Sequence, residues 1–394
     1  MKKIHSVVKD VITFSKSIYG EEFVPLHRPI FKGNELKYVT DCIHSNFVSS
    51  VGAKVTEFEN MICEFTGAKY AIATVNGTSA LHTAINLADV KDGDEVITQS
   101  LTFIATCNAI SYTGATPIFI DVDKDTMGMS PNALQNFLEN NANIKDKKCY
   151  NKISGKKISA CIPMHTFGLP CRVDEIAKIC KEWNITLIED IAESLGSFLN
   201  TKHTGNFSKM ASLSFNGNKV ITTGGGGMLI TNDEDLAKKA KHITTTAKVP
   251  HPFEFVHDRI GYNYRLPNIN AALGCAQMEN LHEMLEIKKK IAGKWKSFFD
   301  ERNINFIQGI KGATPNFWLN AICLESKNER DFFLEYTNKN DVMTRPIWTL
   351  MSRLEMFKDC QTDGLKNSIW LEERIINVPS SVPEGYLKKC REKN

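Results

Sequence analysis

One lysine, Lys219, is placed where covalent chemistry with a carbonyl ligand could occur. It comes shortly after the strand-like run 212–215 and shortly before four consecutive glycines at 224–227. A lysine amine can form a Schiff base with an aldehyde or ketone that the fold holds beside it. Glycines next to such an amine let the main chain approach a bound molecule closely, because they carry no side chain. The segment therefore predicts a site at which Lys219 reacts with a carbonyl ligand.

A carboxylate is expected at the same site. Asp190 follows residues 185–189, an apolar run with the pattern of a buried parallel strand. Residues that end such strands lie at the carboxyl edge of the sheet, where α/β proteins bind their ligands. A carboxylate there can pair with a protonated pyridine nitrogen. The alternative is the N-cap of a helix, which is the more common role of an acidic residue after a strand.

An anion site is indicated by residues 75–81. Gly77, Thr78 and Ser79 follow a predicted strand and open a predicted helix. Main-chain N–H groups and the Thr78 hydroxyl would face a bound phosphate at the positive end of the helix dipole. The same segment is also rich in good capping residues, so a capped helix without a ligand is the alternative.

The glycines at 224–227 do not form a nucleotide-binding motif. They lack the Lys-Ser/Thr of a P-loop, and Leu229 stands where a dinucleotide fingerprint requires its third glycine. An amine, a carboxylate and a phosphate cradle are instead the three parts that a pyridoxal 5′-phosphate (PLP) enzyme needs. Their combination predicts PLP as the cofactor.

The composition is that of an ordinary globular protein. Its 394 residues are 42% hydrophobic and 24% charged, and the net charge is +3. The basic residues are scattered, which argues against a nucleic-acid surface, and no apolar run approaches the ~20 residues that span a bilayer. Residues 1–3 resemble the start of a signal peptide, but Lys9, Asp10 and Lys16 interrupt the stretch that follows. We therefore expect a cytoplasmic protein that binds neither nucleic acid nor membrane.

The cysteines point to no further cofactor. All eleven are scattered singly, without a C-x-x-C pair or clustered histidines. This distribution predicts neither a disulfide framework nor a metal site.

Strand and helix patterns alternate from about residue 34 to residue 246. The predicted strands are 70–75, 95–98, 117–121, 158–163, 185–189, 211–214 and 228–231. The predicted helices include 53–66, 79–88, 173–183 and 233–242. Strands that are separated by helices pair in parallel and carry helices on both faces of their sheet. The pattern therefore predicts an α/β sandwich.

Two further parts flank this region. Val7, Val8, Val11 and Ile12 recur at helical spacing near the N-terminus. From about residue 268 the pattern changes to a long amphipathic helix that runs toward residue 299, followed by shorter elements. We predict an N-terminal helix and arm at 1–32, a large PLP-binding domain at 33–267 and a small C-terminal domain at 268–394.

Motifs along almost the whole chain resemble those of one family, the sugar-nucleotide aminotransferases of the DegT/DnrJ/EryC1/StrS group. The matching segments are NGTSAL at 76–81, GDEVI at 93–97, TFIAT at 102–106, GATPIFIDVD at 114–123, EDIAES at 189–194, SFNGNKVITTGGGGM at 214–228 and GYNYRLPNINAALG at 261–274. The resemblance implies PLP-dependent transferase fold type I, which is aspartate aminotransferase-like. That fold has a large domain with a mixed, mostly parallel sheet between helices and a smaller C-terminal α/β domain.

The resemblance also implies roles for individual residues. The cofactor-binding residues would be Gly77, Thr78, Ser79, Phe103, Asp190, Glu193, Ser214, Lys219 and Asn263. Lys219 would bind the cofactor covalently and shuttle protons, while Asp190 would pair with the pyridine nitrogen. Phe103 would stack on the ring, and Thr78, Ser79 and Ser214 would hold the phosphate.

Two implied roles concern the partner subunit and the ring hydroxyl. Asn263 would contact the phosphate of the cofactor that is bound in the partner subunit, so that the two subunits of a homodimer share their active sites. Glu193 stands where the family more often has glutamine, near the ring hydroxyl. Arg265 matches a motif position, and either ligand binding or support of the interface would explain it.

The C-terminal segments 344–351 and 377–381 are similar to one branch of the family. That branch aminates C4 of nucleotide-linked 4-keto-6-deoxy-N-acetylhexosamines and includes enzymes of legionaminic acid and bacillosamine synthesis. Arg345 and Trp348 would then line the sugar-nucleotide site, although arginine and tryptophan are also common in dimer interfaces. The sequence leaves open whether the nucleotide is UDP or GDP.

The expected reaction is a ping-pong transamination with L-glutamate as the amino donor. The alternatives are amination of another nucleotide-linked keto sugar, such as a perosamine-type sugar, and a PLP-binding regulator without turnover. A dehydratase branch that removes a C3 hydroxyl has histidine in place of the lysine, so Lys219 argues against it. A generic doubly wound protein with structural glycines would not explain why all the parts occur in order.

Overall fold

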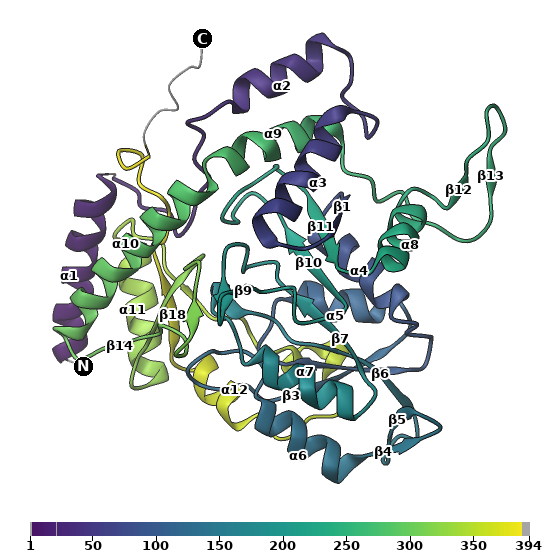
Figure 1. The fold of residues 1–394 in the computed structure, drawn as a ribbon. Coiled ribbons are helices and arrows are strands. Elements are labelled where there is room, and N and C mark those ends of the chain that lie inside the picture. Colours follow the sequence, from purple (N-terminus) through teal and green to yellow (C-terminus); the bar gives the residue numbers. More distant parts are fainter. Residues whose placement is uncertain (1, 21, 388–394) are drawn as a thin grey trace.

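A nine-stranded sheet forms the centre of the computed structural model, which describes residues 2–20 and 22–387 (Figure 1). Its strands follow the order β1-β11-β10-β7-β6-β2-β3, and the hairpin β4-β5 extends the sheet from β6. The bounds are β1 Tyr70–Thr74, β2 Glu95–Gln99, β3 Thr116–Ile120, β4 Ala142–Lys145, β5 Lys148–Asn151, β6 Lys157–Ile162, β7 Thr186–Asp190, β10 Met210–Ser214 and β11 Gly227–Thr231. All seven predicted strands occur in this sheet, and their ends differ from the prediction by one residue at most.

The sheet is mixed. Parallel pairing joins β3 to β2, β2 to β6, β6 to β7 and β7 to β10, whereas β11 is antiparallel to both of its neighbours, β1 and β10. β11 is antiparallel because the loop 215–226 contains no helix, so β11 returns beside β10 as a hairpin. The hairpin β4-β5 is also antiparallel, both within itself and to β6. The predicted mixed, mostly parallel sheet is confirmed.

Helices cover both faces of this sheet. Their bounds are α3 Ala53–Thr66, α4 Gly77–Leu87, α5 Ile104–Ser111, α6 Pro131–Asn141, α7 Val173–Glu182 and α8 Glu234–Thr244. α4, α5 and α8 share a buried apolar cluster with Val96 on one face, while α6 and α7 share another with Ile97 on the opposite face. Neighbouring residues of β2 serve opposite faces because side chains alternate along a strand. The predicted α/β sandwich is confirmed.

A second sheet lies in the C-terminal part of the chain. It is four-stranded and antiparallel, in the order β14-β16-β18-β17. The elements of this part are α9 Asn268–Glu279, α10 Leu281–Asp300, β14 Asn305–Phe306, β16 Asn320–Cys323, α11 Lys327–Lys339, β17 Arg345–Pro346, α12 Lys366–Glu372 and β18 Ile375–Val378. Helix α1, Lys2–Tyr19, packs against α11 at the side of the molecule (Figure 1). The domain boundaries at residues 32 and 267 stay predictions.

The prediction of one long helix from residue 268 was wrong. Two helices, α9 and α10, are separated at Asn280, whose φ is −102° and ψ is −2°. Asparagine favours helix ends because its side chain competes for main-chain hydrogen bonds. Buried apolar residues continue across the break, from Met278 in α9 to Leu281 and Met284 in α10, and so the pattern alone did not reveal it.

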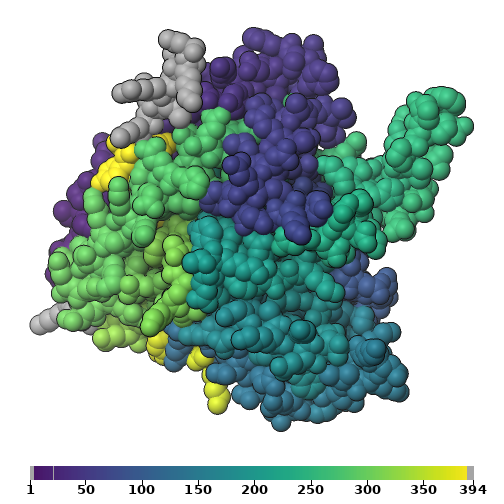
Figure 2. Space-filling view, in the orientation of Figure 1, coloured from purple at the N-terminus to yellow at the C-terminus, as the bar shows by residue number. Residues whose placement is uncertain are grey.

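The remaining elements are short. They are α2 Glu35–His44, β8 Phe198–Leu199, β9 Lys202–His203, β12 Lys248–Val249, β13 Val256–His257 and β15 Ala313–Thr314, with 3₁₀ turns at Thr166–Gly168, Met351–Arg353 and Glu355–Phe357. The hairpin β12-β13 projects from the body of the molecule (Figures 1 and 2). Within the described residues, every helix is too short or too polar to cross a bilayer.

A buried carboxylate ties the C-terminal part to the central sheet. Asp121 directly follows β3, and its Oδ1 accepts hydrogen bonds from the N–H and the hydroxyl of Ser368 in α12, at 2.7 Å and 2.6 Å. Its Oδ2 accepts from the N–H of Asn367 at 2.7 Å. Hydrogen bonds to a charged acceptor contribute more than those between neutral groups. Asp121 is therefore expected to hold α12 against β3.

Replacing this carboxylate should destabilise the protein. Asp121→Ala removes the acceptor of these three hydrogen bonds, two of them buried, and we expect the free energy of unfolding to fall by about 3 kcal/mol. Urea denaturation of the variant and of the wild type measures the difference. Asp359→Ala, at an exposed position, is the control and should change the free energy by less than about 0.5 kcal/mol. Equal stabilities of Asp121→Ala and the wild type would contradict this role.

Candidate active site

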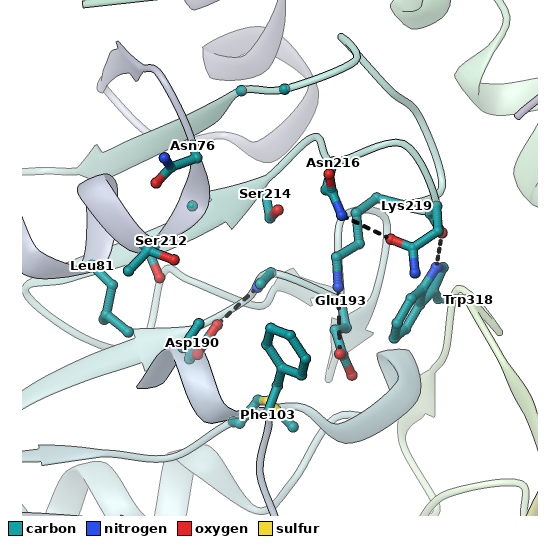
Figure 3. Close-up of a pocket in the computed structure, with 18 of the residues that line it drawn as sticks. Asn76, Leu81, Phe103, Asp190, Glu193, Ser212, Ser214, Asn216, Lys219 and Trp318 are labelled. Carbon is teal, nitrogen blue, oxygen red and sulfur yellow. Dashed lines mark hydrogen bonds and ion pairs between the residues drawn. The ribbon is translucent and has the colours of Figure 1, made fainter. Parts of the chain in front are cut away.

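A cavity of about 240 Å³ lies where the ends of β7 and β10 face the start of α4 (Figure 3). The loop after β10 and two aromatic residues of the C-terminal part complete its wall. The residues predicted from the sequence that line it are Gly77, Thr78, Phe103, Asp190, Glu193, Ser214, Lys219 and Trp348. The fold thus brings the predicted amine, carboxylate and anion site into one cavity.

Strand register brings these groups to one edge of the sheet. Asp190, the last residue of β7, is paired with Ser212 in β10. Ser214, the last residue of β10, is paired with Gly227, the first of β11, and Gly227 is paired with Thr74 at the end of β1. The ends of three strands therefore open into the same cavity, as expected for ligand sites in α/β sheets.

Asp190 is a buried carboxylate inside the cavity. Its Oδ2 accepts a hydrogen bond from the Thr106 hydroxyl at 2.7 Å, and its Oδ1 accepts one from the N–H of Ala192 at 3.1 Å. Burial raises the pKa of Asp190, while these hydrogen bonds and the positive charge of Lys219 act in the opposite direction. A cationic ring nitrogen in the cavity would relieve the cost of burying this carboxylate.

Its neighbour Glu189 has a structural role instead. Side-chain alternation along β7 turns Glu189 away from the cavity. Its carboxylate accepts hydrogen bonds from the N–H groups of Gly205 and Phe207, at 2.8 Å and 2.9 Å, and contacts Nε2 of His165 at 3.1 Å. Glu189 therefore anchors the segment that leads into β10, and only Asp190 of the acidic pair faces a ligand.

Lys219 and Glu193 meet in the cavity. The Nζ of Lys219 is 3.4 Å from Oε1 of Glu193, whose Oε2 accepts a hydrogen bond from the N–H of Phe167 at 2.8 Å. Burial raises the pKa of Glu193 to about 7, although the positive charge of Lys219 acts in the opposite direction. The site therefore pairs an amine with a carboxyl group that can gain or lose a proton near neutral pH.

The start of α4 forms the anion end of the cavity. Oδ1 of Asn76 accepts from the N–H of Ser79 at 2.7 Å, which makes Asn76 the N-cap. The N–H groups of Gly77 and Thr78 precede the first intrahelical hydrogen bond and can serve a ligand. A β-carbon on Gly77 would lie 2.8 Å from the β-carbon of Ser214, so glycine lets the helix start touch the end of β10. A bound phosphate would meet main-chain N–H groups and a hydroxyl here.

These features fit PLP. The phosphate of PLP suits the helix start, its pyridine nitrogen suits the buried carboxylate of Asp190, and its aldehyde suits the amine of Lys219. Phe103 lines the same cavity and leaves about half of its surface exposed, which is compatible with stacking on a bound ring. The residues present therefore match the three chemical parts of the cofactor.

Three predicted site residues lie outside the cavity lining. Ser79 is buried in the first turn of α4, where its main-chain oxygen accepts from the Thr83 hydroxyl. Asn263 is exposed, and its Oδ1 accepts from Nε of Arg265 at 3.0 Å. Arg345 is exposed beside α11. Arg265 lines a separate surface pocket at the base of the hairpin β12-β13.

Sequence reasoning missed Trp318. This side chain lines the cavity, its ring lies 3.9 Å from the Nζ of Lys219, and its Nε1 donates to the main-chain oxygen of Asn218 at 2.6 Å. Asn216 and Asn218, which flank the lysine motif, also line the cavity. Their position beside Lys219 in the sequence could have identified these two residues as site residues, whereas nothing in the sequence connects Trp318 to that motif.

Three aromatic side chains line the cavity, Phe103, Trp318 and Trp348, and the buried Phe167 packs against both tryptophans. These four side chains are here called the aromatic wall. The ring of Phe167 lies 4.9 Å from that of Trp348 and 6.4 Å from that of Trp318. Phe103 lies 6.2 Å from Trp348. Such spacings are typical of interacting aromatic pairs, which present broad apolar surfaces. The wall can exclude water and cover the apolar face of a substrate.

Comparisons with known proteins cover most of the chain. A family model described as the DegT/DnrJ/EryC1/StrS aminotransferase family matches residues 29–383. A putative pyridoxal phosphate-dependent aminotransferase, EpsN of Bacillus subtilis (strain 168), is 36% identical over 84% of this chain and 83% of the relative. GDP-perosamine synthase of Escherichia coli O157:H7 is 35% identical over 91% of this chain and 93% of the relative.

Solved structures agree on the fold. PseC of Helicobacter pylori, an aminotransferase involved in the biosynthesis of pseudoaminic acid, superposes with a TM-score of 0.82 at 23% identity, over 91% of this chain and 93% of that one. The PLP form of the putative sugar aminotransferase Spr1654 from Streptococcus pneumoniae gives 0.81 at 21% identity, over 94% and 95% of the two chains. The predicted fold, that of PLP-dependent transferases of type I, is confirmed.

The raised pKa of Glu193 predicts a pH-dependent stability. Because its pKa rises from 4.5 to about 7 on folding, the folded chain binds more protons than the unfolded chain between these values. The stabilisation from this group is complete below pH 4.5 and is lost as the pH rises through 7. Relative to the wild type, Glu193→Gln in the cofactor-free protein should therefore gain up to about 3 kcal/mol of unfolding free energy between pH 4.5 and 7.

Urea denaturation at several pH values measures this gain. The exposed Glu182→Gln is the matched control, and its difference from the wild type should stay constant. A pH-independent difference for Glu193→Gln would show that its carboxyl group titrates normally.

Proposed function

Since the chain belongs to the DegT/DnrJ/EryC1/StrS aminotransferase family, we propose that it transfers the amino group of L-glutamate to C4 of a nucleotide-linked 4-keto-6-deoxy sugar. Family membership makes the protein a PLP-dependent aminotransferase of sugar nucleotides. One observation carries the proposal: Lys219, Asp190 and the helix start at Gly77 line a single cavity.

The proposed acceptor is a UDP- or GDP-linked 2-acetamido-2,6-dideoxyhexos-4-ulose. Its 4-amino product would serve the synthesis of bacillosamine, legionaminic acid or a related surface glycan. Trp348, from the segment that suggested this branch, lines the cavity and supports a contact with the sugar. The exposed guanidinium of Arg345 would need the nucleotide part to extend out of the cavity.

A perosamine-type acceptor is the second candidate. The relative named GDP-perosamine synthase is 35% identical over 91% of this chain. This similarity supports a GDP-linked sugar without an acetamido group as strongly as the C-terminal segments support the acetamido sugar. The two candidates differ in the substituent at C2, so the assay below separates them.

PLP, when bound, takes the amino group from glutamate and passes it to the ketone of the sugar. In this proposal the Nζ of Lys219 binds the cofactor and then moves the proton at the reacting carbon in both halves of the reaction. The carboxylate of Asp190 holds the proton on the ring nitrogen. The N–H groups at Gly77 and Thr78, with the hydroxyl of Ser214, bind the phosphate.

The remaining walls tune this chemistry. Glu193 lies 3.4 Å from the Nζ of Lys219 and can exchange a proton with it near neutral pH, since burial raises its pKa to about 7. We propose that it also contacts the ring hydroxyl, as the isosteric glutamine would. The aromatic wall excludes water from the reacting carbon, which strengthens the electrostatic interactions in the cavity.

We further propose that two chains form a homodimer that shares its active sites. Asn263 lies outside the cavity of its own chain, as a residue that serves the partner must. The nearby hairpin β12-β13 projects from the surface (Figure 2), and it carries Phe253 and Phe255, which are 79% and 80% exposed. Large exposed apolar side chains on a projecting element are typical of a protein interface. The cytoplasm stays the predicted location of the reaction.

An assay of the purified protein tests the reaction. The mixture contains PLP, glutamate and either UDP-linked or GDP-linked 4-keto-6-deoxy sugars, with and without a 2-acetamido group, and mass spectrometry follows the 4-amino product. We expect product from one acceptor class and formation of 2-oxoglutarate in equal amount. Lys219→Ala should lose the visible absorbance of the lysine-bound cofactor and at least about 1,000-fold of the turnover.

Each result decides a different part of the proposal. Normal turnover by Lys219→Ala would overturn the assignment of the reactive lysine. Loss of the wild-type visible band on adding glutamate, without product from any of these sugars, would retain the aminotransferase and reject the proposed acceptors. If glutamate leaves the visible band of the wild-type protein unchanged, the result would favour a PLP-binding regulator without turnover.

The proposed dimer predicts two separable effects. Phe253→Asp combined with Phe255→Asp should raise the dimer dissociation constant by about 100-fold or more, because it places charges in an apolar contact. Asn263→Ala should leave the dimer intact and weaken PLP retention by about tenfold, the loss of one charge-assisted hydrogen bond.

Sedimentation velocity and a dialysis assay of bound PLP measure these effects. Ile153→Asp is the matched control, since Ile153 is 71% exposed but lies away from the hairpin. A wild type that sediments as a monomer with full PLP occupancy would reject the shared site.

A further inference from the structure

Lys288 in α10 is a buried cation that the proposed reaction does not use. Its side chain is only 2% exposed. Nζ donates to the main-chain oxygens of Ser380 and Trp318, at 2.7 Å and 3.2 Å, and lies 3.0 Å from Nε2 of His27. These three acceptors satisfy all the hydrogens of an ammonium group, but none of them carries a negative charge. Burial accordingly lowers the pKa of Lys288 to about 7.

The third acceptor, His27, stays neutral. Burial and then the positive charges of Lys288 and Lys219 lower its pKa well below the ordinary value. A neutral imidazole has one nitrogen free to accept, so Nε2 of His27 can receive a hydrogen from Lys288.

Trp318 connects Lys288 to the active site. Its main-chain oxygen accepts from Lys288, and its main-chain N–H donates to Oδ1 of Asn316 at 2.8 Å. Its indole Nε1 donates to the main-chain oxygen of Asn218, the residue before Lys219. Figure 3 shows the indole ring beside the Lys219 side chain, and the Nζ lies 3.9 Å from the ring centroid. Every polar atom of Trp318 is therefore held by a hydrogen bond.

The cluster joins segments that are far apart in sequence. His27 belongs to the N-terminal arm, Lys288 to α10, Trp318 to the loop before β16, and Ser380 to the loop after β18. Lys219 lies in the β10-β11 loop of the central sheet. The indole hydrogen bond is thus a direct connection between the C-terminal part and the loop that carries the reactive amine.

We propose that Lys288 is a positioning residue for the aminotransferase reaction. By holding the main-chain oxygen of Trp318, it keeps the indole ring against the side chain of Lys219 and the indole N–H on Asn218. The amine then stays directed into the cavity, toward Glu193 and the cofactor position. Lys288 does not line the cavity itself. This inference rests on the proposed role of Lys219 as the reactive amine.

The kinetic test compares two lysines of the same helix. Lys288→Met replaces a buried lysine with an apolar side chain of similar volume, and the exposed Lys290→Met is the matched control. In the holoenzyme, Lys288→Met should lower kcat about 10- to 100-fold, because a shift of about 1 Å at a reacting group has this effect. The KM values for glutamate and sugar should stay within about threefold, since Lys288 contacts neither substrate.

A double-variant test shows whether Lys288 acts through Trp318. Trp318→Leu removes the ring, so adding Lys288→Met to it should lower kcat by less than about twofold further. Lys288→Gln keeps an amide donor on a shorter side chain, so it should lose less kcat than Lys288→Met, about threefold. If Lys288→Met does not fold, the kcat of Lys288→Gln is compared with that of Lys290→Gln instead.

Fluorine NMR gives a readout that does not depend on turnover. In holoenzyme labelled with 5-fluorotryptophan, Trp318→Phe assigns the Trp318 resonance among those of the five tryptophans. We expect this resonance to shift or broaden in Lys288→Met and to stay unchanged in Lys290→Met. If the wild-type protein transfers no amino group, the proposed function is wrong. The fluorine spectra would still test the coupling between Lys288 and Trp318.

Three results would overturn the positioning role. They are a kcat of Lys288→Met equal to that of Lys290→Met, a full additional loss when Lys288→Met is combined with Trp318→Leu, and an unchanged Trp318 resonance in Lys288→Met.

Discussion

The active site depends on the position of β10 between β7 and β11. Parallel pairing sets the end of β7 at Asp190 beside Ser212, and antiparallel pairing sets Gly227 between Ser214 and Thr74. This register leaves the turn into α4 directly against β11, where a β-carbon on Gly227 would lie 2.3 Å from the carbonyl carbon of Asn76. Only glycine permits so close an approach. The carboxylate, the anion site and the loop with the reactive amine reach one edge of the sheet through this single arrangement.

Burial gives the groups at that edge their chemistry. Two carboxyl groups, Asp190 and Glu193, lie in a cavity where desolvation raises both pKa values, and the cation of Lys219 acts against each shift. Glu189, one residue from Asp190, is buried just as deeply, yet main-chain N–H groups and His165 satisfy it and hold its pKa below the ordinary value despite burial. The two neighbouring acids lie on opposite faces of the strand. One face is a closed structural network and the other is open to a cation supplied by a ligand.

Much of the fold and part of the site were predictable from local patterns. Apolar runs located every long strand of the central sheet to within one residue, because burial on both faces requires continuous hydrophobicity. The short strands of the C-terminal sheet and the break at Asn280 were not predictable, since a few residues carry no periodic signal and buried apolar residues continue on both sides of the break. The motif around Lys219 pointed to a carbonyl ligand, and the resemblance to a known family supplied the roles of Phe103, Ser214 and Glu193. The cavity contains all three of these residues.

By itself the sequence determined the class of chemistry, because a lysine, an acidic residue after a strand and a helix start rich in small polar residues are local features with chemical meaning. It also determined the α/β architecture, through the order of apolar strands and helices. Only the tertiary structure decided which side chains share a cavity. Trp318 lines it, whereas Ser79, Asn263 and Arg345 lie outside the lining. It likewise brought His27, Lys288 and Ser380 together behind the reactive amine. Such contacts join segments 92 to 261 residues apart, and their existence depends on how the parts pack, which no local pattern encodes.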